Sequence, residues 1–162
     1  WNEGSKLVMA CRGEKRRHLK VELPDGFSLP PGFDNPTFVR PGILAVKGPR
    51  FKAGQGQEQA QLLASHLERF EAFLDKHLPL VLIVDDPAFT AATENNFLWV
   101  TFTRVNPSHD TYGVQSFIEN KHWGCKGALI LDARKKPHHA PELETDEAVN
   151  QKVDLIMQEI GL

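Results

Sequence analysis

The chain has 162 residues, 41% of them apolar and 25% charged, which is typical of a single globular domain that buries a core of its own. The formal net charge of −2 excludes a global field that would attract nucleic acid or an acidic membrane surface. No apolar run approaches the roughly 20 residues of a membrane-spanning helix, and no signal-peptide pattern is present, so we expect no membrane span and a cytoplasmic location.

The amino-terminal region is predicted to hold two strands, at residues 6–11 and 19–23, joined by a solvated basic turn at 12–18. This basic stretch is also a candidate phosphate or nucleic-acid contact. It lacks interleaved aromatic residues, so we expect no nucleic-acid partner. Residues 24–41 are rich in proline and glycine and predict an ordered loop packed on the surface. The chain begins at Trp1 rather than at a methionine, which indicates a piece of a longer protein.

A third strand is predicted over residues 42–46, followed by a glycine-rich basic loop that leads into a helix. Backbone amides at a helix start, together with nearby cations, can hold an anion. The spacing matches neither the P-loop nor the dinucleotide-binding fingerprint, so a plain connecting loop is the alternative. The candidate anion-binding residues are Lys47, Arg50, Lys52, Gly54 and Gly56.

Residues 57–76 predict one long helix with a single apolar stripe. Full burial of each large side chain on this stripe contributes roughly 1.5–3 kcal/mol, so the helix should anchor the sheet. The stripe consists of Ala60, Leu63, Leu67, Phe70 and Leu74, and is widened by Leu62 and Phe73.

Residues 80–84 are five consecutive apolar residues and predict a strand buried on both faces, which is typical of a parallel sheet covered by helices. Asp85 and Asp86 follow at its carboxyl end, where open α/β sheets form a crevice. Residues 97–105 fit a strand or a buried helix with an N-cap at Thr90 or Thr93. Pro107 ends this element. We therefore predict an α/β single domain, 1–162, with a mostly parallel or mixed central sheet flanked by helices.

The region after Pro107 offers few catalytic candidates. Ser108, His109 and Asp110 are adjacent, whereas the members of a hydrolytic triad converge from separate segments. We expect Asn106 and Asp110 to cap turns. Lys121, His122 and Trp123 combine a cation, an imidazole and an indole, so they either line a pocket for an aromatic acid or serve in packing.

The carboxy-terminal region predicts a strand at 127–132 and a helix at 146–160 with Thr145 as N-cap. The adjacent His138 and His139 have no partners at zinc-site spacing, so we expect no metal ligands here. Cys11 and Cys125 lie far apart and are expected to be free thiols. The helix has a narrow apolar seam that docks on its own domain or on a neighbouring subunit, formed by Val149, Val153, Ile156 and Ile160.

Three parts of the sequence together resemble one protein family. They are Val84-Asp85-Asp86 with Leu98-Trp99-Val100, then the run 103–107 (Thr-Arg-Val-Asn-Pro) with Asp110, and the run 124–136 with its Gly-rich turn, strand and Asp-Ala-x-Lys end. This pattern resembles the carboxy-terminal part of the UbiD family, decarboxylases that use prenylated flavin. The resemblance is strong over 81–136 and weak over 1–52. It implies that residues 94–104 are mostly helix and that Lys121, His122 and Trp123 fall near the substrate.

The resemblance also implies a division of labour. UbiD-family proteins are several times longer than this chain, and their catalytic Arg and Glu residues, prenylated FMN and divalent metal (Mn or Mg) belong to the preceding amino-terminal part. We therefore expect no catalytic residue and no bound cofactor in this piece, which alone should not be catalytic. Its expected partners are the amino-terminal flavin-binding domain of the same chain and further copies in a homo-oligomer, through the last helix. The intact protein would decarboxylate or carboxylate an aromatic or unsaturated acid. The alternative is a stand-alone phosphate- or nucleotide-binding module.

Overall fold

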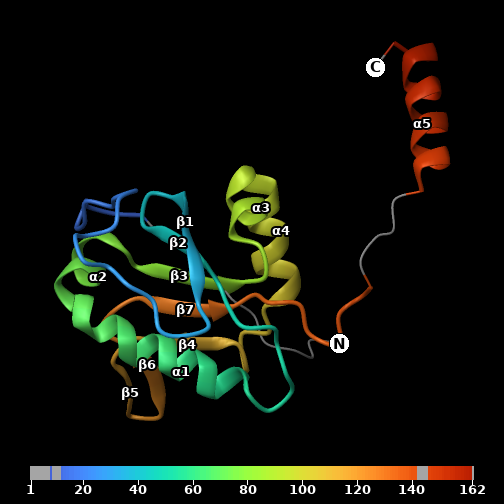
Figure 1. Cartoon of the computed structure of the whole chain (residues 1–162). Helices are drawn as coiled ribbons and strands as arrows, with labels where there is room; N and C mark the ends of the chain where they lie inside the picture. Colours follow the sequence, from blue (N-terminus) through green and yellow to red (C-terminus); the bar gives the residue numbers. More distant parts are fainter. Residues whose placement is uncertain (1–7, 9–11, 142–145, 162) are drawn as a thin grey trace.

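The computed structural model describes residues 8, 12–141 and 146–161, and these are organised around a five-stranded mixed sheet (Figure 1). Its strand order is β1-β2-β3-β7-β4. The three central strands β2, β3 and β7 are parallel, and β1 and β4 pair antiparallel at the two edges. The predicted mixed α/β fold is confirmed. The strands span Asp34–Arg40 (β1), Ile43–Lys47 (β2), Leu80–Val84 (β3), Thr111–Gly113 (β4) and Leu129–Asp132 (β7).

Helices cover both faces of this sheet, which explains why β3 has no polar residue. Val81 and Ile83 pack in the core cluster that includes α1 and α2, whereas Leu80, Leu82 and Val84 pack in the cluster that includes α4. Alternate residues of a strand point to opposite faces, so a strand buried on both faces is apolar throughout. The helices span Gly56–Leu67 (α1), Glu71–His77 (α2), Pro87–Ala92 (α3) and Glu94–Arg104 (α4).

The predicted helix at 57–76 is interrupted. A 3₁₀ turn, η1 (Glu68–Phe70), separates α1 from α2. Phe70 leaves the helical conformation at φ −110°, ψ 22°, and its ring packs 5.0 Å from the ring of Phe27. Most of the predicted stripe is buried, but Leu62 is exposed, because it lies one step off the stripe on the solvent side.

The amino-terminal prediction is wrong in two places. Residues 19–23 form no strand, and Lys20 makes only isolated backbone hydrogen bonds, to Gly42 and His77. The predicted loop at 24–41 contains β1, which takes the edge position beside β2. This strand includes Pro36, which an edge strand tolerates because one side of its backbone needs no partner. The strand predicted at 6–11 lies outside the described residues, apart from Val8, which has no regular structure.

Several sequence predictions are confirmed. Leu80–Val84 is the buried strand β3. Residues 94–104 form α4, the helix that the family resemblance implies and that the residue pattern alone leaves open. The Thr93 side chain accepts a hydrogen bond from the backbone N–H of Asn96 and so caps α4. The last helix, α5, spans Glu147–Glu159. Its N-cap is Asp146, which accepts from two backbone amides, whereas Thr145 lies outside the described residues.

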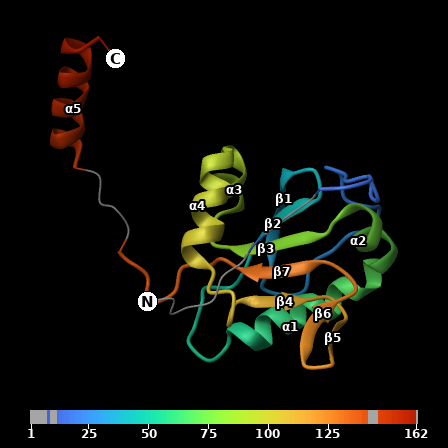
Figure 2. The ribbon, with the colours of Figure 1, turned by 180° about the vertical axis from the view of Figure 1, so that it is seen from behind.

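Two carboxy-terminal elements lie beyond the main sheet. Strands β5 (Ser116–Glu119) and β6 (His122–Cys125) form a separate two-stranded hairpin. Helix α5 stands clear of the domain in both views (Figures 1 and 2), and each of its described residues is exposed. Among the described helices, none has the length and apolar character needed to cross a membrane.

Candidate functional site

Asp132 and Arg134 form a buried, bidentate ion pair at the carboxyl end of β7. Arg134 Nη2 lies 2.6 Å from Asp132 Oδ2, and Arg134 Nε donates to Asp132 Oδ1 at 2.8 Å. Neither side chain is more than 1% exposed. Arg134 Nη1 also donates to the Pro49 carbonyl at 2.7 Å and to Gln59 Oε1 at 2.5 Å. The pair therefore ties the loop after β2 and the start of α1 to the end of β7.

Lys136 extends this charged cluster towards α4. Its buried Nζ donates to the carbonyl oxygens of Asp132 at 2.7 Å and Arg104 at 3.2 Å, and lies 3.2 Å from Asp110 Oδ2. The backbone N–H of Lys136 donates to Nδ1 of His139 at 3.0 Å. Burial, followed by the charges of His138, Lys136 and Arg104, lowers the pKa of His139, and Asp110 opposes this shift. The imidazole is therefore held as a neutral acceptor.

The two aspartates after β3 have structural partners. Asp86 Oδ1 accepts from the backbone N–H of Phe89 at 3.0 Å and caps α3. Asp85 Oδ2 accepts from Arg104 Nη1 at 3.1 Å and from the backbone N–H of Lys135 at 2.7 Å. At this end of the sheet, Asp85 and Asp132 are thus paired with Arg104 and Arg134 of the same chain. Sequence reasoning located the carboxylates but missed the buried Arg134, because charged residues after a strand usually face solvent.

The predicted anion-binding residues lie along the loop that Arg134 holds. Lys47, Arg50 and Lys52 are exposed. Gly56 begins α1, and a Cβ there would lie 3.0 Å from the Phe51 ring. Glu58 in the first turn of α1 already places negative charge at the positive end of the helix dipole. Anion binding by this loop stays a prediction.

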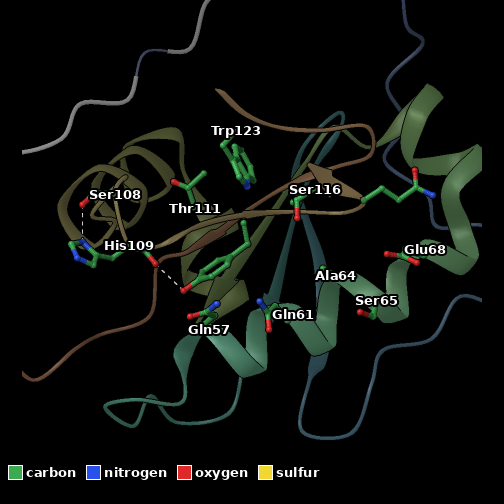
Figure 3. Close-up of a pocket in the computed structure, with 13 residues that line it drawn as sticks. Gln57, Gln61, Ala64, Ser65, Glu68, Ser108, His109, Thr111, Ser116 and Trp123 are labelled. Carbon is green, nitrogen blue, oxygen red and sulfur yellow. Dashed lines mark hydrogen bonds between the residues drawn. The ribbon is translucent and has the colours of Figure 1, made fainter. Parts of the chain in front are cut away.

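A polar cavity of about 510 Å³ lies between α1, β4 and the β5–β6 hairpin (Figure 3). Figure 3 shows Gln57 and Gln61 of α1 on one side and Trp123 and Thr111 on the other. Hydroxyl and amide groups dominate the lining. The cavity is lined by Gln57, Gln61, Ala64, Ser65, Glu68, Ser108, His109, Thr111, Tyr112, Gly113, Gln115, Ser116 and Trp123.

Glycines let the hairpin lie close to β4. A Cβ at Gly113 would lie 2.4 Å from Cys125 Cβ and 3.3 Å from the Trp123 ring, so any larger residue would push the hairpin away. Asn120 and Lys121 have φ of 49° and 67° and form a two-residue turn of the type that matches strand twist. Of the three predicted pocket residues, Trp123 lines the cavity, while Lys121 lies at the exposed turn and His122 is exposed on β6. A substrate role for these residues stays a prediction.

Tyr112 lines the cavity as a hydrogen-bond donor. Burial, then the charges of Asp132 and Asp110, raises the pKa of Tyr112, and Arg134 partly offsets this. The phenol donates to the carbonyl of His109 at 2.8 Å, so it acts as a neutral donor.

The adjacent serine, histidine and aspartate serve the turn rather than a triad. Ser108 Oγ lies 2.7 Å from His109 Nδ1, but Asp110 Oδ2 accepts from the backbone N–H of Asn106 at 2.7 Å. Asn106 Oδ1 in turn accepts from the backbone N–H of Ser108 at 3.2 Å. The predicted turn-capping roles of Asn106 and Asp110 are confirmed.

Cys125 is a free, partly buried thiol, as predicted. Burial raises its pKa, and Arg17 partly offsets this shift. A thiol with a raised pKa carries less of the reactive thiolate at neutral pH. Cys11 lies outside the described residues.

Comparison with known proteins relates the chain to decarboxylases. No family model matches it. The chain is 33% identical over 78 residues to a 4-hydroxybenzoate decarboxylase subunit of Chlamydia pneumoniae. This aligned region covers 48% of the chain and 13% of that protein. The chain is 35% identical over 152 residues to an uncharacterized protein of Chlamydia caviae. This aligned region covers 94% of the chain and 24% of that protein.

Solved structures with a similar arrangement include a decarboxylase and a UbiD-class enzyme. The vanillic acid decarboxylase of Sedimentibacter hydroxybenzoicus in its closed form gives a TM-score of 0.48 at 14% identity, over 80% of this chain and 29% of that one. The UbiD-class enzyme HmfF of Pelotomaculum thermopropionicum in complex with FMN gives a TM-score of 0.45 at 12% identity. The match covers 75% of this chain and 28% of HmfF.

The chain is thus an α/β domain related to decarboxylase subunits. The sequence resembles the carboxy-terminal part of UbiD-family decarboxylases, and the comparisons confirm this resemblance. The chain spans between 13% and 24% of the length of the curated relatives it matches.

Proposed function

We propose that this chain is the carboxy-terminal domain of a cytoplasmic UbiD-like carboxy-lyase. The intact enzyme would decarboxylate or carboxylate an aromatic or unsaturated acid with prenylated FMN held by an amino-terminal flavin-binding domain of the same chain. The single observation that carries this proposal is the similarity over 78 residues to a 4-hydroxybenzoate decarboxylase subunit. A further support is the resemblance over residues 81–136, which includes β3, α4 and β7.

The side chains of the described residues offer no cluster for a divalent metal. They contain no group of three or more His, Cys, Asp or Glu side chains that could hold a metal ion. The carboxylates nearest the sheet crevice, Asp85 and Asp132, already pair with Arg104 and Arg134. In the proposal, the flavin and a Mn or Mg ion therefore belong to the amino-terminal domain, and we assign no catalytic residue to this chain.

In this proposal the chain closes one side of the substrate site and holds subunits together. The cavity beside the hairpin supports the first role, because Trp123 offers an aromatic wall among hydroxyl and amide groups. The exposed apolar residues of α5 support the second. The chain's contribution to catalysis would be to orient the acid and exclude water, while the flavin supplies the electron sink when bound.

Activity measurements with the intact enzyme and with the isolated chain test the proposal. We expect CO₂ release from an aromatic or unsaturated acid by the intact protein reconstituted with prenylated FMN, and none by residues 1–162 alone. Turnover by the isolated chain, or an intact protein that binds no flavin, would contradict it.

A matched pair of hairpin variants tests the substrate-side role. In the intact enzyme, Trp123→Ala should lower kcat/KM about tenfold, the factor for roughly 1.4 kcal/mol of lost contact. Ile118→Ala is the control, because Ile118 pairs with Trp123 across the hairpin but does not line the cavity. Equal effects of the two substitutions would assign the hairpin a purely structural role.

A further inference from the structure

A second cavity, of about 470 Å³, lies between the basic turn near the amino terminus and the end of α2. These two segments run side by side at the end of the domain away from α3 and α4 (Figures 1 and 2). The cavity shares no lining residue with the one beside the hairpin. We call it the basic cavity, and it is lined by Arg16, Arg17, His18, Asp75, Lys76 and His77.

Three contacts hold the basic turn against α2, so the basic cavity is a product of the fold. Nδ1 of His77 donates to the carbonyl of His18 at 2.5 Å. The backbone N–H of Lys20 donates to the carbonyl of His77 at 3.4 Å, and Arg17 Nη2 lies 3.5 Å from Asp75 Oδ1. The cations of the turn are therefore brought to those at the end of a helix that lies far away in sequence.

The basic cavity holds an excess of positive charge. Its lining contains two arginines and a lysine but one carboxylate, Asp75, in a chain whose formal net charge is −2. Lys76 complements the negative end of the α2 dipole, and Arg17 pairs with Asp75. Within the described part of the chain, no carboxylate pairs with Arg16. Like charges held together repel one another, and a bound anion would offset this repulsion.

We propose that the basic cavity binds a phosphate group, either free phosphate or that of a small phosphate monoester. A guanidinium donates two parallel hydrogen bonds to phosphate oxygens, and an ammonium group adds a compact positive charge. Arg16 supplies the first from the basic turn, and Lys76 supplies the second from α2. Both side chains are exposed and so reach a ligand without disturbing the core.

The shape of the basic cavity favours a small phosphate over a nucleic acid. Proteins that bind single strands combine an extended basic groove with aromatic side chains on which bases stack. The lining here is one concavity that contains no Phe, Tyr or Trp. The proposal concerns a site apart from the cavity assigned to the acid substrate, so it does not depend on the decarboxylase function.

Titration of the 162-residue chain with inorganic phosphate, adenosine monophosphate and a short DNA duplex tests the proposal. Calorimetry measures the affinity, and NMR of the backbone amides locates the site. We expect saturable phosphate binding, with the largest amide shifts at residues 16–18 and 75–77. Added salt should weaken this binding, because exposed charges are screened. Tighter binding of adenosine monophosphate than of phosphate would identify a monoester as the ligand, and similar binding would identify free phosphate.

Variants that change one charge test which side chains hold the phosphate. Arg16→Gln and Lys76→Gln should each raise the phosphate Kd about tenfold, the factor for roughly 1.4 kcal/mol of lost interaction. Asp75→Asn should lower the Kd, because it removes the carboxylate from the lining and releases Arg17.

Two substitutions on α5 are matched controls. Lys152→Gln and Glu159→Gln make the same charge changes at exposed positions outside the basic cavity, so they should leave the phosphate Kd unchanged. Circular dichroism of all the variants checks that each one is folded.

Three outcomes would overturn the proposal. The first is that phosphate shows no saturable binding with a Kd below about 1 mM. The second is that Arg50→Gln weakens phosphate binding and Arg16→Gln does not, which would place the anion at the loop before α1. The third is that the DNA duplex binds more tightly than either small phosphate, with an affinity that falls steeply with salt, which would assign a nucleic-acid contact. These measurements use no flavin and no acid substrate, so their outcome is independent of the decarboxylase assay.

Discussion

At the scale of single residues, the buried Asp132–Arg134 pair decides how the carboxyl end of the sheet is built. Two charges taken out of water are costly unless each is paired and hydrogen-bonded. Here the guanidinium reaches both carboxylate oxygens of Asp132, a backbone carbonyl and a side-chain amide. The hydrogen bonds that offset the desolvation of this pair also hold the loop at Pro49. Removal of either partner therefore affects both the end of β7 and this loop.

We predict that Arg134→Met lowers the free energy of unfolding by about 3–5 kcal/mol, because it leaves a buried carboxylate without its partner. Arg17→Met is the control, since the Arg17–Asp75 pair is exposed on both sides and should contribute about 0–1 kcal/mol. Urea denaturation of both variants measures the difference. A loss of similar size in both would contradict the assigned role of Arg134.

At the scale of elements, helix α4 begins where a side chain satisfies its first backbone amides. Thr93 accepts from Asn96 N–H at 3.0 Å, and the Asn96 side chain donates to the Phe89 carbonyl at 2.8 Å. The start of α4 is therefore joined to α3.

We predict that Thr93→Ala lowers the free energy of unfolding by about 1 kcal/mol through loss of the N-cap. Thr93→Ser keeps the hydroxyl and should stay close to wild type. Chemical denaturation with circular dichroism checks both. Equal losses in the two variants would show that the threonine methyl group, rather than the cap, is what matters.

The elements that the sequence predicted correctly are those with local signals. β3 is a continuous apolar run, and the patterns of α5 and of the α4 cap lie within a few residues. Errors arose where a distant contact decides. Phe70 interrupts the long helix where its ring packs against Phe27. Pro36 gives the β1 segment the sequence pattern of a loop, but an edge strand tolerates a proline.

The candidate site was predictable only in part for the same reason. Trp123 is a candidate by its chemistry alone, and it lines the cavity. The opposite wall of the cavity is formed by Gln57 and Gln61, which are far from Trp123 in sequence. They lie on the polar side of α1, where no local sequence signal indicates a site. The burial of Arg134 likewise depends on Pro49 and Gln59, which only the folded sheet brings near.

At the scale of the whole molecule, the chain divides into a packed α/β domain and a helix whose described residues are all exposed. The domain has both faces of its sheet covered without α5. The stability of the domain and the association of copies should therefore be separable properties.

We predict that deletion of residues 141–162 changes the free energy of unfolding of the monomer by less than about 0.5 kcal/mol, the usual limit for changes that touch no core residue. The same deletion should abolish the association between copies that the exposed apolar residues of α5 support. Denaturation at low protein concentration, paired with sedimentation, measures both. A large loss of monomer stability would show that α5 packs on its own domain.

The position of β7 in the sheet bears on how the chain is made. It is the last strand of the sheet in sequence, yet it lies between β3 and β4. While the ribosome is still adding residues before Leu129, β3 lacks one neighbour and the surfaces of α1 and α4 have an incomplete layer to cover. Because domains fold as units, the sheet of the nascent polypeptide can close only after β7 has left the ribosome, and the apolar residues of β3 lack one neighbouring strand until then.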